Sequence, residues 1–467
     1  MRVKTMTIKN LFGDKKFYRT IFSIAVPIMI QNGITNFVAL LDNIMIGQVG
    51  TEQMSGTAIV NQLLFVFNLC IFGILAGPGI FGAQFFGKGS TEGVRHTFRF
   101  KVILAAIVLA AGALILGFFD DSLITMYLTG EGTEGNKALT LQSGKEYLSV
   151  MLIGLVPFTI SQVYASTLRE TNKTLPPMFA GLAAVFTNLA FNWVLIFGHL
   201  GFPAMGVRGA AIATVISRFF ECIIVVVWTH ANKHENEFII GAFRSFKLPR
   251  DLVKKIIISG LPLFANEFLW SAGMAVLNKC YSERGLDVVA ATNISSTIFN
   301  LFSVIFIALG NSVGIIVGQL LGTGDMKKAR ETDTKLIVFT VLAGALTGGL
   351  MAAFSGLFPS FYNTTDSVRE MAGSLIMISG LFMPFAAFMH ATYFTLRSGG
   401  RTLVTFLFDS AYVWGITIPT ALLLVNFTDF GILNIYFCCQ FVDIIKVTIG
   451  LILVIRGVWL RNIVKND

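Results

Sequence analysis

Long apolar stretches alternate with short polar connections along the whole chain. An apolar stretch of about 20 residues is long enough for a helix to cross the hydrocarbon core of a bilayer. Twelve such stretches can be marked, at residues 18–43, 54–80, 100–118, 143–166, 175–198, 208–230, 254–280, 288–318, 335–356, 370–394, 403–425 and 430–455. The pattern predicts an all-α polytopic membrane protein with twelve transmembrane helices.

The composition excludes several other classes of protein. Of the 467 residues, 54% are hydrophobic and 13% are charged, whereas about a quarter of the residues in a soluble domain are charged. Too few polar groups remain to cover a surface that faces water, so a soluble enzyme, a disordered protein and a nucleic-acid binder are all excluded. The five cysteines are an odd number in or beside apolar stretches, so no disulfide framework is expected.

The basic residues predict the orientation. Most of the 35 Lys and Arg residues lie near the two chain ends or in alternate connections between the apolar stretches. The opposite connections and adjoining span ends hold only Lys137, Lys145, Arg208, Lys279, Arg284 and Arg369. Because Lys and Arg collect on the cytoplasmic side, both termini are expected in the cytoplasm. The net charge of +9 therefore indicates topology and not a surface that binds phosphate.

The two halves of the chain repeat one another. A shift of 235 residues aligns spans 1–3 without a gap and superposes Pro27 on Pro262, Gly79 on Gly314, Gln84 on Gln319 and Gly87 on Gly322. Later in each half, a shift of 228 superposes 167–174 on 395–402. Six spans per half is an even number, which predicts parallel repeats. We expect an N-terminal lobe at 1–230, a cytoplasmic linker at 231–253 and a C-terminal lobe at 254–467, with a central cavity that opens alternately to each side.

A glycine-rich stretch at 77–82 matches the G-x-G-x-x-G dinucleotide fingerprint but lacks its context. No short strand precedes it, and no acidic residue follows about 20 positions later. Glycines that break a helix before a basic loop explain it better. With no nucleotide motif and no clustered histidine or metal ligands, we expect a transporter driven by an ion gradient, without a cofactor, and not an enzyme.

Ionisable residues within the spans are the candidate functional groups, because charge at membrane depth persists mainly where it faces a cavity. Glu267 follows Pro262 with no basic residue within helical reach and is the strongest candidate. Asp409 also lacks a basic partner nearby in sequence, and Asp42 fits either the cavity or the outer surface. Two pairs at i, i+3, Arg218 with Glu221 and Asp443 with Lys446, are expected to neutralise themselves on one helix face.

Asn188 and Asn192 lie one turn apart on the same helix face. Such a pair can supply oxygen ligands to Na⁺, although buried asparagines more often join two helices by hydrogen bonds.

The chain resembles the multidrug and toxic-compound extrusion (MATE) transporters over nearly its whole length. The resemblance rests on Pro27 with residues 38–47, on 79–89 and its copy at 314–324, and on 188–198 and 206–214. It implies two six-helix lobes arranged as a V, which export organic cations or amphipathic drugs by alternating access in exchange for Na⁺ or H⁺.

The resemblance also implies site residues. A cation site of the N-terminal lobe maps onto Asp42, Asn188, Asn192 and Thr214, with Asn192 where some members carry an aspartate. Glu267 resembles a span-7 glutamate of a second site. Span 10 contains no acid, so Asp409 on span 11 is taken as a hypothetical substitute. Glu267, Asp409 and Asp42 are the expected substrate-binding residues, and the only metal expected is a transported Na⁺.

A lipid-linked saccharide flippase of the same superfamily is the alternative function. A flippase that handles anionic head groups would need several basic residues in its cavity, whereas only Arg218 and Lys446 lie within spans. The expected partners are small organic cations and the lipid bilayer, with no nucleic acid. We expect a monomer in a bacterial inner membrane.

Overall fold

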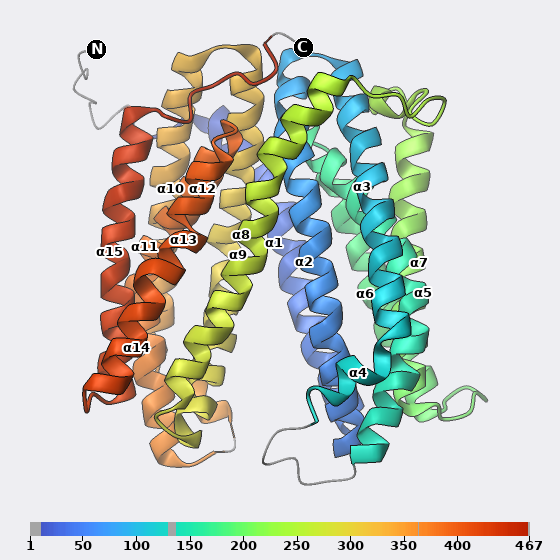
Figure 1. Ribbon diagram of the computed structural model, residues 1–467, viewed down its shortest axis with the longest axis vertical. Coiled ribbons are helices and arrows are strands. Elements are labelled where there is room, and N and C mark those ends of the chain that lie inside the picture. Colours follow the sequence, from blue (N-terminus) through green and yellow to red (C-terminus); the bar gives the residue numbers. More distant parts are fainter. Residues whose placement is uncertain (1–10, 129–136, 363, 466–467) are drawn as a thin grey trace. The chain divides into compact units, whose positions relative to one another are not determined.

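The chain is almost wholly helical in the computed structural model, which describes residues 11–128, 137–362 and 364–465. This confirms the predicted all-α class. The long helices are α1 (Lys15–Gly47), α2 (Thr51–Lys88), α3 (Thr91–Phe118), α5 (Lys137–Glu170), α6 (Leu175–Phe197), α7 (Gly206–Ala231), α8 (Arg250–Ser282), α9 (Leu286–Thr323), α10 (Met326–Ala353), α11 (Asp366–Ser398) and α15 (Ile432–Arg456) (Figure 1).

Shorter helical pieces complete the described chain. One span is built from consecutive pieces: α12 (Thr402–Phe408), α13 (Ser410–Tyr412), the π-helical turn η4 (Val413–Thr417) and α14 (Ile418–Phe427). The other short pieces lie in connections: α4 (Asp120–Thr125), η2 (Glu237–Ile239) and η3 (Phe358–Phe361).

Ten helical segments of the described chain are long and apolar enough to cross a membrane, with 402–427 counted as one segment. The other two long helices, α1 and α8, have 33 residues each, and this length also exceeds what one crossing needs. Together these segments are the twelve predicted spans. Most helices extend several residues beyond the apolar stretch that predicted them, because a helix continues into its polar ends.

Contacts divide the chain into two compact units. One unit contains 30–82 and 91–253, and the other contains 1–29, 83–90 and 254–467. The lobe boundaries that we predict, 1–230 and 254–467, stay a prediction. In the first unit, α5 packs against α3 and α7, and α6 packs against α7 (Figure 1).

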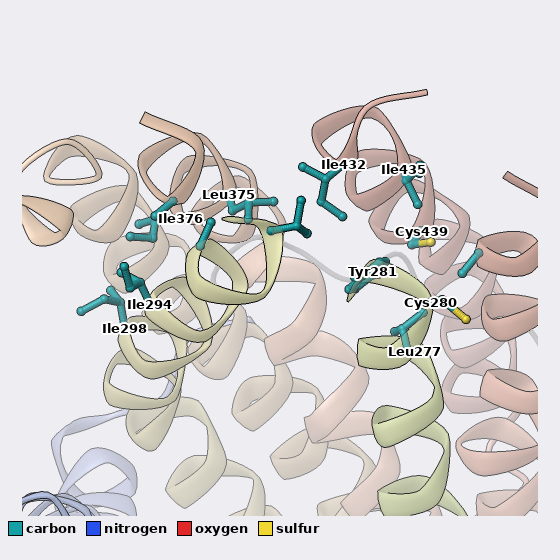
Figure 2. Close-up of a cluster of buried hydrophobic side chains, with 14 of the residues drawn as sticks. Leu277, Cys280, Tyr281, Ile294, Ile298, Leu375, Ile376, Ile432, Ile435 and Cys439 are labelled. Atoms are coloured by element: carbon teal, nitrogen blue, oxygen red, sulfur yellow. The ribbon is translucent and has the colours of Figure 1, made fainter. Parts of the chain in front are cut away.

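In the other unit, α11 packs against α9, α10 and α15. An apolar cluster fills the space at one end of these helices. Figure 2 shows α8 contributing Leu277, Cys280 and Tyr281, with side chains from α9, α11 and α15 around the same region. The rest of the labelled cluster is Ile294, Ile298, Leu375, Ile376, Ile432, Ile435 and Cys439.

The glycine-rich end of α2 does not break the helix, so our expectation for 77–82 was wrong. α2 continues through Pro78 to Lys88. Its last turns, which belong to the second unit described, pack directly against the end of α9. A Cβ on Gly87 would overlap the Gln319 carbonyl, and a Cβ on Gly322 would overlap the Gln84 carbonyl. The repeated glycines therefore allow two backbones to touch.

Candidate functional site

Five polar side chains from four segments form what we call the C-terminal polar cluster. They are Asn266, Glu267, Tyr393, Asp409 and Lys446, from α8, α11, the α12–α13 junction and α15. The cluster contains two of the predicted site residues, Glu267 and Asp409. They are close enough to interact electrostatically.

Asp409 lies where the helix between residues 402 and 427 is interrupted. Its backbone (φ −102°, ψ −82°) ends α12, and the π-helical turn η4 follows within a few residues. Asn266 stabilises the interruption. Its side-chain carbonyl accepts hydrogen bonds from the Ser410 backbone N–H (3.2 Å) and hydroxyl (2.7 Å), while its amide nitrogen donates to Asp409 Oδ2 (3.0 Å). Interrupted helices of this kind often accompany functional sites.

Asp409 is paired, in contrast to our expectation. The Lys446 Nζ lies 2.8 Å from Asp409 Oδ1, and both side chains are largely buried. The prediction of an ion pair between Asp443 and Lys446 is wrong as well. Asp443 instead accepts a long hydrogen bond from the Thr417 hydroxyl (3.4 Å). Spacing along one helix could not show this contact, because the partner comes from another helix.

Among the described residues, Glu267 has a hydroxyl partner and no ion-pair partner. Tyr393 donates a hydrogen bond of 3.0 Å to Glu267 Oε1. Arg397 is near enough to act on Glu267 electrostatically. It makes no ion pair with Glu267 among the contacts of the described chain, and its guanidinium lies 5.3 Å from the centre of the Phe394 ring. Glu267 is thus the carboxylate of the cluster without a bonded cation.

The other predicted site is partly described. Asn192 donates to Asn188 Oδ1 (3.0 Å), Asn188 donates to Thr214 Oγ1 (3.2 Å), and Thr214 donates to the Ala210 carbonyl (3.0 Å). This chain of hydrogen bonds joins α6 to α7. Asp42 belongs to α1, but its side chain lies outside the described part of the structure.

A buried ion pair between α3 and α5 escaped the sequence analysis. Lys101 has no exposed surface, and its Nζ contacts both Glu170 oxygens at 2.6 and 2.7 Å and the Thr167 hydroxyl at 3.0 Å. The Glu170 carboxylate rests against α2, where Gly79 and Gly82 leave room for it. Lys101 and Glu170 are 69 positions apart, and helical spacing reports only neighbours on the same helix, so this pair could not be predicted from the sequence.

The pair expected between Arg218 and Glu221 is not formed. Arg218 instead donates to the Gly154 carbonyl (3.4 Å) and lies 5.1 Å from the centre of the Phe158 ring. Among the described residues, no group of three or more His, Cys, Asp or Glu side chains could hold a metal ion.

The contacts leave one carboxyl group of the cluster without a paired cation. Lys446 pairs with Asp409, whereas Glu267 accepts a hydrogen bond from Tyr393 and forms no ion pair among the described residues. A carboxyl group in a low-dielectric environment favours a neutralising partner, such as a proton or a bound cation.

Comparison with known proteins identifies the family of the chain. The MatE family model matches residues 27–194 and again 262–424, so the two matches begin at the prolines that the 235-residue shift superposes. The chain is 26% identical over 459 residues to a probable multidrug resistance protein NorM of Thermotoga maritima, covering 96% of this chain and 94% of that protein. It is 21% identical to the multidrug resistance protein NorM of Photobacterium profundum, covering 87% of each.

Solved structures share the fold. A MATE protein crystallised in complex with MaL6 has a TM-score of 0.84 and 19% identity, and the alignment covers 97% of this chain and 98% of that one. An outward-facing multidrug resistance MATE transporter of the MOP superfamily has the same TM-score and coverage, with 18% identity. Because the two matches of the family model together cover most of the chain, this protein belongs to the MatE family of multidrug efflux transporters.

Proposed function

We propose that this protein is a Na⁺- or H⁺-coupled antiporter that exports organic cations or amphipathic drug-like compounds by alternating access. The observation that carries the proposal is Glu267, which is half-buried and bonded to the Tyr393 hydroxyl. No Lys or Arg side chain of the described residues forms an ion pair with it.

Exchange follows from competition for Glu267. The coupling ion and the exported cation both neutralise the same carboxylate, so each displaces the other. A state with the carboxylate unneutralised and buried is unfavourable, because an isolated charge costs several kcal/mol in an apolar environment. The protein then changes conformation mainly when one of the two cations is bound.

Asp409 contributes to this site through its interaction with Glu267. Its own charge is compensated by Lys446, so Asp409 influences the electrostatic potential at Glu267 and does not require a bound cation of its own. Asp409 in this role takes the place of the acid that span 10 lacks.

A second cation site is proposed at Asp42, Asn188, Asn192 and Thr214. The hydrogen-bond chain through the two asparagines supports it, since it orients amide oxygens within one small region of α6 and α7. Sodium requires several oxygen ligands, and Asp42 would supply the carboxylate.

The flippase alternative is not favoured. It needs free basic groups to bind a pyrophosphate, yet the basic residues Lys101, Arg218 and Lys446 within the spans are already engaged. Lys101 contacts Glu170. Lys446 pairs with Asp409, and Arg218 donates to the Gly154 carbonyl. We propose further that the protein works as a monomer in the bilayer of a bacterial inner membrane, with both termini cytoplasmic.

The test is efflux of a fluorescent cationic dye from proteoliposomes, with an imposed Na⁺ gradient compared with an imposed pH gradient. Wild type should move the dye under one of the two gradients, which identifies the coupling ion. Glu267→Gln should reduce gradient-driven efflux to the rate of protein-free liposomes, because the amide cannot exchange a cation.

Glu283→Gln is the matched control, because it makes the same change at an exposed position next to the end of α8 and should leave efflux unchanged. Full gradient-driven efflux by Glu267→Gln would remove Glu267 from the coupling site. Dye movement under neither gradient, with folded wild type, would overturn the antiporter proposal.

A further inference from the structure

A buried carboxylate outside the proposed ion sites has a single hydrogen-bond partner. Asp333 lies on α10 with no exposed surface. The Thr395 hydroxyl of α11 lies 2.6 Å from Asp333 Oδ1, and Oδ2 has no hydrogen-bond partner in the described structure.

In the first repeat, the corresponding helices α3 and α5 hold a buried carboxylate whose charge is compensated. The 228-residue shift superposes Thr167 on Thr395, and both threonines face the preceding long helix of their own repeat. In the first repeat, Lys101 compensates Glu170 beside Thr167. The second repeat keeps the threonine and places a carboxylate on α10, but the counterpart of Lys101 is Leu336.

Among the described residues, the helices that pack against α10 bring no counter-charge to Asp333. α1 packs against α10 through Tyr18 and Phe22, whose rings contact Phe339. The basic residues of α1 near this end, Lys15, Lys16 and Arg19, are exposed. α9 has one charged residue, Asp287, in its first turn and far from the α9–α10 connection. On α11, residues 366–370 hold three charged side chains at the end opposite Thr395. The nearer groups are engaged elsewhere or uncharged: Tyr393 donates to Glu267, Arg397 lies over the Phe394 ring, and the His390 ring contacts aromatic side chains.

The charged residues of α10 itself also point elsewhere. Arg330 donates to the Ile455 carbonyl of α15 (2.9 Å), and the Lys335 ammonium lies 5.9 Å from the centre of the Phe17 ring. Lys327, Lys328 and Glu331 are exposed. Lys446 of α15 is held by Asp409.

A proton is the ligand that fits this environment. An ionised carboxylate without a counter-charge is costly to bury. Sodium needs several oxygen ligands, and Asp333 has one side-chain oxygen partner. A proton on Oδ1 can be donated to Thr395 Oγ1, whose own hydrogen then goes to the Ala391 carbonyl at 3.1 Å. In this arrangement the protonated carboxyl group of Asp333 and the Thr395 hydroxyl each donate one hydrogen bond.

We propose that Asp333 is a proton-binding site of the second repeat, separate from the C-terminal polar cluster and occupied while α10 and α11 enclose it. The proton is released only when water reaches the carboxylate between these helices. Asp333 lies about two turns after the start of α10, so the exchange takes place near the end of α10 that is predicted to be cytoplasmic.

The test is infrared spectroscopy of the full-length protein in lipid nanodiscs, with aspartate labelled by ¹³C at the side-chain carboxyl group. Wild type at neutral pH should show the C=O stretching band of a protonated, labelled carboxylic acid. Asp333→Asn should lose this band. Asp366→Asn, at an exposed position on α11, should keep it.

Asp333→Glu is the second variant, for use if Asp333→Asn fails to fold, because it keeps a carboxyl group but removes the labelled one and should also lose the band. A wild-type spectrum without the band, or a band that survives in the Asp333 variant that folds, would overturn the proposal. So would a band that disappears on addition of Na⁺ at constant pH, which would make the site a sodium site.

Discussion

The Asp409–Lys446 pair sets the charge of the C-terminal polar cluster. Burying two opposite charges gains little net stability, because their attraction is offset by the loss of hydration. Removing one of them is costly, since the other charge is then buried alone. The pair therefore limits which single substitutions the cluster tolerates, and it leaves Glu267 as the carboxyl group of the cluster without an ion-pair partner among the described residues.

Lys446→Met should lower the free energy of unfolding by about 3–5 kcal/mol, the usual cost of removing one partner of a buried pair. The measurement is the thermal unfolding midpoint of the purified protein in detergent. The double variant Asp409→Asn/Lys446→Met should recover most of the loss. Lys328→Met, at an exposed position on α10, is the control and should match wild type. A stable Lys446→Met protein would show that Asp409 has another counter-charge.

At the scale of single residues, the sequence predicted which acidic residues lie in the cluster better than it predicted the partners of buried charges. Glu267 could be selected because an unpaired acid within an apolar stretch is rare and expensive. The Lys446 contact to Asp409 and the Lys101 contact to Glu170 could not be predicted, because helical spacing reports only neighbours on the same helix.

Two spans of the molecule have local features that matter for packing. The span 402–427 is interrupted at Asp409, whereas α2 runs unbroken through its glycines to a close contact with α9. Apolar length predicted both spans. It could not distinguish the interrupted helix from the unbroken one, because the Asn266 side chain that stabilises the interruption comes from another helix.

Gly87→Ala should destabilise the protein by about 1–3 kcal/mol, the range for an overpacked contact, because the added methyl group overlaps the Gln319 carbonyl. Thermal unfolding in detergent measures the change. Gly349→Ala on α10 makes the same substitution where a Cβ meets nothing within 4 Å, and it should not lower the midpoint, because alanine is the better helix former. Equal midpoints for the two variants would show that the α2–α9 contact can relax without cost.

The whole chain is a duplicated six-span unit whose copies have diverged in charge. The family model matches each copy separately. The duplication could be predicted from the sequence because aligned prolines and glycines survive at a constant shift. The difference between Lys101 with Glu170 in one copy and Asp333 alone in the other required side-chain positions.

The orientation of the whole chain can be measured by cysteine labelling in intact cells. Asp429→Cys, between α14 and α15, should react with a membrane-impermeant maleimide added outside. Lys247→Cys, in the predicted cytoplasmic linker, should react only after the cells are opened. Both positions are exposed, and wild type, whose five cysteines are buried or half-buried, reports the background. The reverse labelling pattern would invert the predicted topology.

The Lys101–Glu170 pair has a consequence for how the chain enters the membrane. The two residues are 69 positions apart, so at roughly 5–20 residues per second the ribosome delivers Glu170 on the order of ten seconds after Lys101. During this interval the ammonium of Lys101 has no carboxylate to bind and must extend toward the polar interface. We therefore expect α3 to reach its final depth only when α5 arrives, which makes the two helices one insertion unit.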